Sequence, residues 1–255
     1  MKIMLISYKH KFIFIHSRKT AGSSIKSYLS SFLGPNDILV GAWKDIIKKG
    51  GKINKRFIQD ILHPRVVINW RTWKVIASLM VKKIELKDGL NTIHKKSYKQ
   101  FRNPGHQTAK EIKNIYRNEW KNFYKFCFVR NPYEKEVSDY KWRSKKAKKS
   151  YTFKEFLERK LRNDLKNEIN EYPPTNKPMY KIDGSVVVDY IGRYENIHDD
   201  LLRISRKIGI PFRPSDLPKA KKSEDYNYET YYDEEKKKMV EHLYKGEIEK
   251  LGYCF

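Results

Sequence analysis

Short apolar runs alternate with amphipathic segments along most of the chain. Residues 11–16 (KFIFIH) and 123–129 (FYKFCFV) are rich in β-branched and aromatic side chains, which is typical of buried strands. Residues 186–191 (VVVDYI) predict a third strand. Apolar residues at helical spacing predict helices over 25–33, 106–120, 134–142, 152–165, 197–208 and 231–251. This alternation of strands and helices is typical of an α/β fold.

Local signals mark several boundaries of these elements. Thr152, followed three residues later by Glu155, predicts a capping box at the start of a helix. Two loops are expected, at 143–150 and 172–178. Residues 38–101 show no clear period, and we assign them as a variable basic segment on the substrate side. Without internal repeats or a long linker, residues 1–255 are expected to form one domain.

Composition adds a strong positive charge to this picture. The 255 residues include 55 Lys and Arg and 30 Asp and Glu, which gives a formal net charge of +25. Such a charge indicates an anionic partner, for which nucleic acid, anionic lipid, acidic polysaccharide and a phosphate-rich cofactor are candidates. Hydrophobic residues make up 39%, enough for a folded core.

No segment of the sequence predicts membrane insertion or a cysteine framework. No apolar run approaches the ~20 residues of a membrane span. The start, MKIMLIS, is too short for the apolar region of a signal peptide, so we expect a cytoplasmic protein. Cys127 and Cys254 lie far apart in the sequence, so we expect neither a disulfide framework nor a zinc site.

The first candidate site is the loop that follows the first strand, residues 16–24 (HSRKTAGSS). The N–H groups and dipole at the start of the next helix favour an anion. Gly22 allows close approach of the backbone, and Lys19 adds a positive charge. Further hydroxyl donors come from Thr20, Ser23 and Ser24. This loop is not a Walker A motif because its lysine precedes the glycine, and an ordinary strand–helix turn remains an alternative.

The second candidate site follows the strand at 123–129. Arg130 at its end offers a planar guanidinium suited to a phosphate, and Pro132 is placed to begin a helix. Ser138 lies two turns into that helix and can share a ligand with Arg130 only if the loop folds back. Two anion sites at strand ends fit a nucleotide that carries phosphate at both ends and lies across the carboxyl edge of a sheet.

These motifs together resemble those of a known family. HSRKTAGSS resembles the 5′-phosphosulfate loop, typically H-x-P-K-T-A-G-T-S, of sulfotransferases that use 3′-phosphoadenosine-5′-phosphosulfate. FCFVRNPYEKEVSDY, at 126–140, is similar to their 3′-phosphate motif. GHQTAKEI at 105–112, VVDYIGRYENI at 187–197 and the tail YYDEE…IEKLGYCF are similar to the carbohydrate-type branch. One departure is Arg18, which stands where the family usually has proline and leaves the loop more basic.

The resemblance implies a fold and a donor. The expected fold is a P-loop-like three-layer α/β structure with a central, mostly parallel sheet flanked by helices. The expected donor is 3′-phosphoadenosine-5′-phosphosulfate, released as 3′-phosphoadenosine 5′-phosphate, with no metal required. The residues expected to bind it are Arg18, Lys19, Thr20, Ala21, Gly22, Ser23, Ser24, Arg130 and Ser138.

Two catalytic roles follow from the same resemblance. Lys19 would neutralise charge on the leaving phosphate. His106 is the candidate general base, by its position in the family pattern and by the ordinary pKa of histidine. His94 and Glu195 are the alternatives, although Glu195 is rather expected to form a structural ion pair with Arg193.

The acceptor is expected to be a hydroxyl of a glycan or glycolipid that is itself anionic. Basic residues are frequent in 44–101 and 143–149, where the resemblance is weakest and where specificity is usually determined. No nucleic-acid partner and no transmembrane segment are expected, and peripheral contact with a membrane stays open. Two alternatives are a P-loop nucleotide kinase, for which no magnesium carboxylate is evident, and a non-catalytic nucleic-acid binder.

Overall fold

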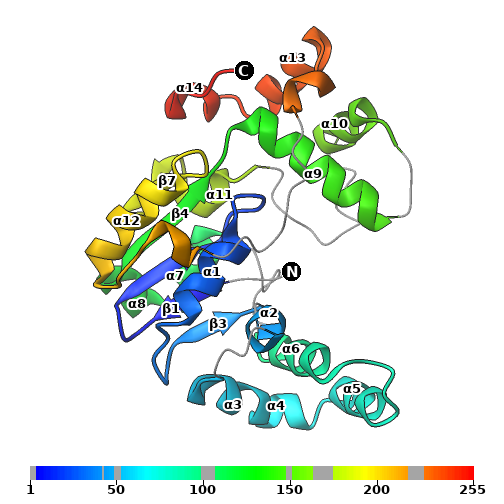
Figure 1. Cartoon of the computed structure of the whole chain (residues 1–255), viewed down its shortest axis with the longest axis vertical. Helices are drawn as coiled ribbons and strands as arrows, with labels where there is room; N and C mark the ends of the chain where they lie inside the picture. Colours follow the sequence, from blue (N-terminus) through cyan, green and yellow to red (C-terminus); the bar gives the residue numbers. More distant parts are fainter. Residues whose placement is uncertain are drawn as a thin grey trace.

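The structure is a computed structural model and describes residues 4–41, 43–48, 53–98, 107–147, 151–162, 175–217 and 227–255. A central β-sheet carries helices on both faces (Figure 1). The strands of this sheet are β1 (Met4–Ser7), β2 (Phe12–Ile15), β3 (Ile38–Val40), β4 (Tyr124–Val129) and β7 (Tyr190–Arg193). A separate two-stranded sheet pairs β5 (Lys181–Ile182) with β6 (Ser185–Val186). The architecture is therefore α/β, as predicted.

The sheet is mixed rather than mostly parallel. Its order is β3-β1-β2-β4-β7, in which β2, β4 and β7 run parallel and β1 pairs antiparallel with both β2 and β3. The sequence did not predict β1, because MLIS offers only four residues between Ile3 and a polar turn. That turn, residues 8–11, joins β1 to β2 as a hairpin, and a short hairpin requires antiparallel strands.

Fourteen α-helices lie among the described residues. Those preceding β4 are α1 (Gly22–Ser30), α2 (Trp43–Lys48), α3 (Lys55–Leu62), α4 (Pro64–Val67), α5 (Trp70–Met80), α6 (Leu86–Lys96), α7 (Ala109–Ile115) and α8 (Arg117–Asn122). Those following it are α9 (Pro132–Ala147), α10 (Phe153–Leu161), α11 (Lys177–Tyr180), α12 (Ile197–Ile208), α13 (Glu234–Leu243) and α14 (Ile248–Leu251). Two 3₁₀ turns are η2 (Pro214–Asp216) and η3 (Tyr228–Tyr231).

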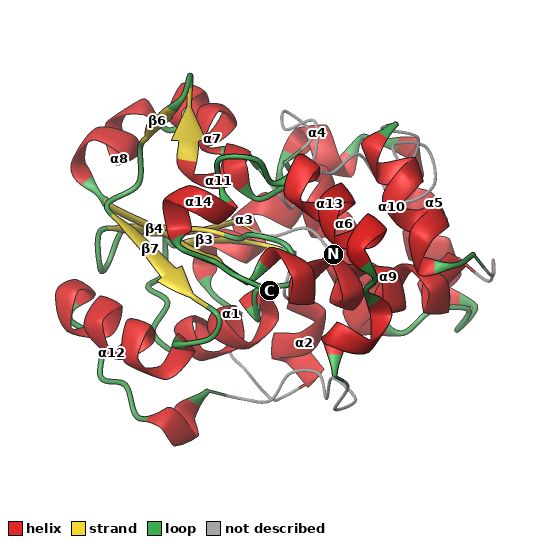
Figure 2. Ribbon diagram, turned by 90° about the horizontal axis from the view of Figure 1, so that it is seen from above, coloured by secondary structure: helices red, strands yellow, loops and turns green. Residues whose placement is uncertain are grey.

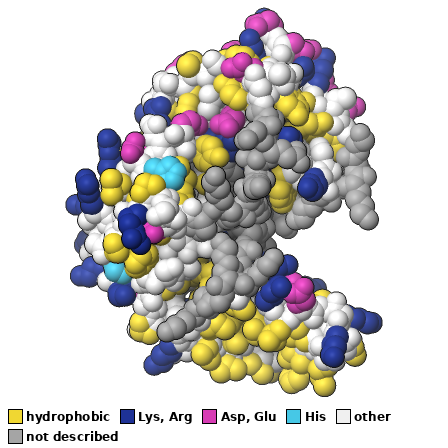
Figure 3. Space-filling model, viewed as in Figure 1, with side chains coloured by type: hydrophobic (Ala, Val, Ile, Leu, Met, Phe, Trp, Pro, Cys, Tyr) yellow, Lys and Arg dark blue, Asp and Glu magenta, His cyan; other side chains and the backbone are white. Residues whose placement is uncertain are grey.

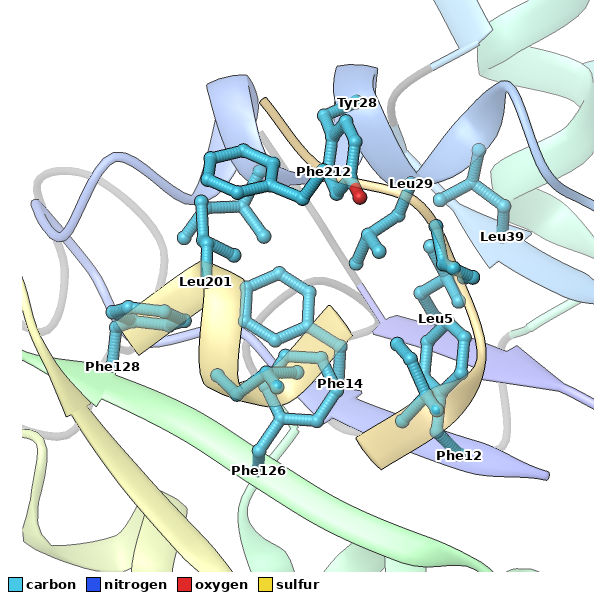
Figure 4. Packing of buried hydrophobic residues seen from close by; sticks show 14 of the residues in the cluster. Leu5, Phe12, Phe14, Tyr28, Leu29, Leu39, Phe126, Phe128, Leu201 and Phe212 are labelled. Atoms are coloured by element: carbon cyan, nitrogen blue, oxygen red, sulfur yellow. The ribbon is translucent and has the colours of Figure 1, made fainter. Parts of the chain in front are cut away.

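Alternate residues of the strands point to opposite faces and form two cores. On one face, Phe14 stacks on Phe126 with ring centroids 5.1 Å apart, and both pack against α1 and α12 (Figure 4). On the other face, the neighbouring residues Ile15 and Cys127 pack with α7, α8 and α11. Figure 2 shows α12 and α8 on opposite sides of the strands. The sheet is thus the middle layer of three.

Two helical groups extend this three-layer body at opposite ends (Figure 1). At one end, α9, α10 and α13 share a third core built around aromatic side chains such as Phe156 and Tyr244. At the other end lie α3 to α6, residues 55–98, which we call the helical region. No helix in the described part of the chain is both long and apolar enough to cross a lipid bilayer.

Several predicted boundaries are confirmed. Helix α12 spans 197–208, as predicted, and ends at Gly209, whose φ of 69° lies in the left-handed region that glycine tolerates. Thr152 caps α10 and forms the predicted capping box with Glu155. The strands predicted at 11–16 and 123–129 correspond to β2 and β4.

Other boundaries were wrong. The helix predicted over 106–120 is two helices, because Tyr116 leaves helical geometry at φ −111° and ψ 57°. The loop predicted from 143 is helical through Ala147, since Arg143 packs inside as part of α9; residues 148–150 lie outside the described part. The third sheet strand is Tyr190–Arg193 rather than 186–191. The final helical stretch is divided into α13 and α14, and α11 begins inside the loop predicted at 172–178.

Candidate functional site

Both predicted anion motifs lie at the carboxyl edge of the sheet. The loop at 16–21 follows β2 and Arg130 follows β4, and these two strands are parallel neighbours. From β2 the chain continues to β3 on one side of the sheet, whereas from β4 it continues to β7 on the other side. At such a switch point, open α/β sheets bind ligands outside the carboxyl ends of their strands. We call residues 16–24 and 130–143 the site region.

The loop before α1 has an unusual backbone. Lys19 and Ala21 have φ values of 64° and 55°, in the left-handed region that disfavours residues with a Cβ. Ala21 occupies the N-cap of α1 without a side-chain cap, and the first turn holds no acidic residue. Strained backbone of this kind is held in place by its surroundings and is frequent at ligand sites. The start of α1 is therefore suited to an anion.

The structure gives Gly22 a role that the sequence did not predict. A Cβ at this position would lie 1.6 Å from Cδ2 of the His16 ring, far closer than any contact allows. The imidazole of His16 is buried and occupies this space. Glycine is thus required by the packing of the loop against itself, beyond any approach of a ligand.

Arg130 joins the two motifs. Its Nη1 donates a hydrogen bond to the carbonyl oxygen of Lys19 at 3.2 Å and lies 3.5 Å from Oγ of Ser138. The buried guanidinium also pairs with Glu134 and stands 4.0 Å above the ring of Tyr194. The structure therefore brings Arg130, Ser138 and the loop together, because the Arg130 side chain lies along the first two turns of α9.

Arg18 is bound to α9. Its Nε donates to Oδ1 of Asp139 at 2.8 Å, and its guanidinium stacks 4.4 Å from the ring of Trp142. Both partners belong to α9. The residue that replaces the family's usual proline thus ties the loop to α9, and its charge is compensated by Asp139 rather than added to the loop.

A buried ionic cluster surrounds this contact. Asp139 also accepts from Nε of Arg143 at 3.3 Å and lies 3.9 Å from Nζ of Lys160. Burial alone would raise the pKa of Asp139, but these three cations outweigh it and hold the pKa well below its usual range. Glu136, on the same helix, is bonded by Lys135, Lys160 and Tyr244.

Several buried polar atoms beside this cluster make no hydrogen bond within the described part of the chain. Among them are Oγ of Ser17, which precedes Arg18 in the loop, and Nη1 of Arg143. A buried donor without a partner costs free energy, so such atoms indicate groups that accept a ligand. Both residues lie in predicted segments, the loop at 16–24 and the basic stretch at 143–149, but neither was predicted to contact the donor.

The three base candidates differ in what the structure shows. His106 lies outside the described residues. His94 is buried in the helical region, where its Nε2 is 3.1 Å from Oδ2 of Asp60 and its ring stacks on Phe57. Burial lowers the pKa of His94, and no open surface reaches it. These contacts make His94 a core residue.

Glu195 has a structural position, although its expected partner was wrong. Its carboxylate accepts the backbone N–H of Asn131 and the hydroxyl of Tyr253. Arg193 instead donates to the carbonyl of Leu251 and stacks on Tyr253. Glu195 thus connects the turn after Arg130 to the C-terminal segment.

Sequence reasoning missed three residues that contact predicted arginines. Glu134 and Tyr194 contact Arg130, and Asp139 binds Arg18. The i,i+4 spacing of Arg130 and Glu134 was a usable signal. Asp139 carried a weaker signal, because a charged residue within a helix is usually exposed.

Within the described ranges, no three His, Cys, Asp or Glu side chains are grouped so as to hold a metal ion.

Comparisons with known proteins identify the family. The chain matches the model of the sulfotransferase family over residues 2–253, nearly its whole length, and it belongs to that family. A protein of Archaeoglobus fulgidus described as uncharacterized is 37% identical over 89 residues, which cover 34% of this chain and 68% of that protein. No solved structure matches the chain significantly. The chain is thus a transferase of sulfuryl groups, and the predicted family is confirmed.

Proposed function

We propose that this sulfotransferase transfers the sulfuryl group of 3′-phosphoadenosine-5′-phosphosulfate to a hydroxyl of an anionic glycan or glycolipid, on a P-loop-like fold. The observation that carries the proposal is the hydrogen bond from Arg130 to the carbonyl of Lys19. It joins the two motifs at neighbouring strand ends, where one nucleotide can reach both.

The loop and the start of α1 fit the 5′ side of this donor. The left-handed residues Lys19 and Ala21 hold the loop beside the uncapped first turn of α1, and the buried Oγ of Ser17 is an unused donor within the described residues. In the proposal the 5′-phosphate is bound by backbone N–H groups of 20–24, which are Thr20, Ala21, Gly22, Ser23 and Ser24, with the hydroxyls of the two serines.

Arg130 and Ser138 fit the 3′-phosphate. Their side chains lie 3.5 Å apart at the end of β4, and Arg130 is buried and held by Glu134 and Tyr194. A guanidinium held in this way loses little side-chain freedom when it binds a phosphate. Arg18, by contrast, is proposed to position the loop through Asp139 rather than to contact the nucleotide.

When bound, the donor supplies a sulfuryl group activated by its bond to a phosphate. Sulfuryl transfer resembles phosphoryl transfer in its loose, in-line geometry, so positioning and electrostatics carry most of the catalysis. Lys19 is proposed to stabilise the charge that develops on the phosphate side. His106 is proposed to take the proton of the acceptor hydroxyl. In the chain it comes two residues before Thr108, the N-cap residue of α7.

The excess of positive charge supports an anionic acceptor. Around α9, the buried cations Arg130, Lys135, Arg143 and Lys160 outnumber the buried carboxylates Glu136, Asp139 and Glu247. Nη1 of Arg143 is a buried donor without a partner in the described part of the chain. Arg143 also begins the basic stretch 143–149, which we propose as part of the acceptor surface.

The test is direct transfer. The protein is incubated with 3′-phosphoadenosine-5′-phosphosulfate and a panel of neutral and acidic glycans and glycolipids, and 3′-phosphoadenosine 5′-phosphate and sulfated product are quantified by mass spectrometry. We expect equal amounts of both, with no requirement for added metal. Turnover with ATP in place of the sulfated donor would instead favour a kinase. A neutral best acceptor whose kinetics ignore salt would overturn the anionic acceptor alone.

A further inference from the structure

The helical region presents apolar side chains to solvent along one stripe of α5. Trp70, Trp73, Ala77 and Met80 recur at the i, i+3, i+7 and i+10 spacing of a single helical face. Trp70 and Trp73 are 59% and 57% exposed, and Met80 is 80% exposed. An ordinary surface helix turns this kind of stripe towards the core. Here the stripe lacks a partner among the described residues.

The neighbouring helices enlarge the stripe into a patch. Exposed apolar residues on α3, α4 and the end of α5 are Ile58, Leu62, Val67, Ile68 and Val81, of which Ile68 is 79% exposed. Figure 3 shows apolar side chains gathered at the lower end of the molecule, where α3, α4 and α5 lie. We call this surface the α3–α5 face. Contiguous exposed apolar surface of this extent marks an interaction site.

Exposed basic residues lie on and next to the helices of the α3–α5 face. Six exposed cations there form no ion pair within the described part of the chain: Lys55, Arg65, Arg71, Lys74, Lys82 and Lys83. The acidic residues nearby are already paired, Asp60 with Arg56, Glu85 with Lys87 and Asp88 with Lys44. The face therefore carries uncompensated positive charge around an apolar centre.

The tryptophans combine both properties. Nζ of Lys74 lies 4.4 Å from the ring centroid of Trp70, and Arg71 lies 5.6 Å from the same ring. Indole rings with cations beside them are typical of surfaces at the boundary between hydrocarbon and phosphate headgroups. A protein partner could cover the apolar side chains, but a phosphate-rich layer above an apolar one matches both these side chains and the cations on and next to the same helices.

We propose that the α3–α5 face docks the protein onto the surface of an anionic lipid bilayer. The apolar stripe of α5 lies in the boundary between headgroups and acyl chains, and the surrounding lysines and arginines contact lipid phosphates. A second copy of the chain is a poorer occupant. A two-fold contact through this face would set the six cations of one copy against the same cations of the other.

The test uses the full chain and lipid vesicles, without nucleotide, so its outcome is independent of the proposed activity. Flotation is measured with vesicles of phosphatidylcholine alone and with vesicles in which about one-third of the lipid is phosphatidylglycerol. We expect binding to the anionic vesicles that falls with added salt, together with a blue shift of tryptophan emission.

Two variants separate the apolar and the charged contributions. Trp70→Gln/Trp73→Gln/Met80→Gln should weaken partitioning at least ~10-fold. Its matched control, Ile115→Gln/Val186→Gln, replaces apolar residues that are 42% and 44% exposed elsewhere and should bind as wild type does. Circular dichroism checks that each variant is folded.

The charge variant is Arg65→Gln/Arg71→Gln/Lys82→Gln/Lys83→Gln. Its control is Lys113→Gln/Lys121→Gln/Arg206→Gln/Lys207→Gln, which removes the same number of exposed cations outside the helical region. We expect only the first to lose the preference for phosphatidylglycerol. If both variants lost this preference equally, the binding would depend on net charge alone, and the proposal would be overturned. Absence of vesicle binding, or self-association in sedimentation that the α5 variant abolishes, would also overturn it, the latter in favour of a second copy.

Discussion

The site region buries charged side chains, whereas the helical region leaves large apolar side chains exposed. In the site region, Arg18, Arg130 and Asp139 are drawn inside and satisfy one another between the loop and α9. In the helical region, Trp70 and Trp73 are exposed to solvent, although tryptophan side chains usually pack in a core. Buried charges fix one precise geometry, because each loses free energy unless its partners are in place. Exposed apolar side chains need no internal partner and therefore indicate an external one.

The first way to test this difference is to remove a buried carboxylate from each region. Asp139→Asn leaves three cations around a neutral amide and should lower the free energy of unfolding by ~3–5 kcal/mol at neutral pH. Asp60→Asn, in the helical region, removes the charge that faces one half-exposed cation, Arg56, and keeps an amide oxygen for His94 and Tyr98, so it should cost less. Urea unfolding followed by circular dichroism measures both. A larger loss at Asp60 would contradict the comparison.

The pH dependence of the Asp139 effect has a defined sign. The folded-state pKa of Asp139 lies below the ordinary value of 3.8, so its stabilisation is present above about pH 4 and is lost as the pH falls towards the folded pKa. The difference between wild type and Asp139→Asn should therefore shrink on acidification below that pH. A difference that stays constant down to strongly acidic pH would show that the charge of Asp139 is not its source.

The next test concerns chemistry within the site region. Lys19→Ala should lower kcat at least ~100-fold, because it removes the charge proposed to face the leaving phosphate. Lys11→Ala is a matched control, since Lys11 is also a lysine with positive φ, 50° against 64°, in a turn at the other end of β2. It should retain wild-type turnover. Turnover of Lys19→Ala within threefold of wild type would contradict the assigned role.

A smaller effect is expected where the loop packs against itself. Gly22→Ala places a Cβ against the His16 ring and should lower stability by ~1–3 kcal/mol, with weakened nucleotide binding. The double variant His16→Ala/Gly22→Ala removes the collision and should regain most of the stability. Thermal unfolding of the four proteins in this cycle measures the coupling. Equal unfolding temperatures of the single and double variants would show that the contact carries no strain.

The smallest effect should come from His94, in the helical region. Its folded-state pKa lies below the ordinary 6.5, so the unfolded chain binds the proton more readily and stability falls as the pH drops below about 6.5. His94→Gln should flatten this dependence by at most ~1 kcal/mol. Hydrogen exchange of α6 amides between neutral and mildly acidic pH measures the change. Identical profiles for wild type and variant would remove His94 as the cause.

Sequence reasoning was most successful where the fold depends on local signals. The strands β2 and β4, the end of α12 at Gly209 and the capping box of α10 each depend on a few adjacent residues. Both predicted anion motifs directly follow a strand, so their place at the sheet edge also depended on adjacent residues alone. The place of Ser138 beside Arg130 needed the structure, since it depends on how the side chain lies along α9.

The rest of the molecule depends on contacts between distant segments. Strands of four or three residues, such as β1 and β3, carry too few side chains for a recognisable period. The pairing of Arg18 with Asp139 spans 121 residues and could not be found from spacing. The helical region showed no period because its apolar residues serve two surfaces, one facing the core and one facing solvent, and their patterns overlap.

The central claim is that the neighbouring ends of β2 and β4 bind one nucleotide phosphorylated at both its 3′ and 5′ positions. Isothermal titration of wild type and Arg130→Gln with 3′-phosphoadenosine 5′-phosphate and with adenosine 5′-phosphate tests it most directly. We expect wild type to bind the first ligand more tightly. The variant should lose ~1.5–3 kcal/mol for that ligand and almost nothing for the second, which lacks the 3′-phosphate. Equal affinity of wild type for both nucleotides, or equal losses in the variant, would contradict the account.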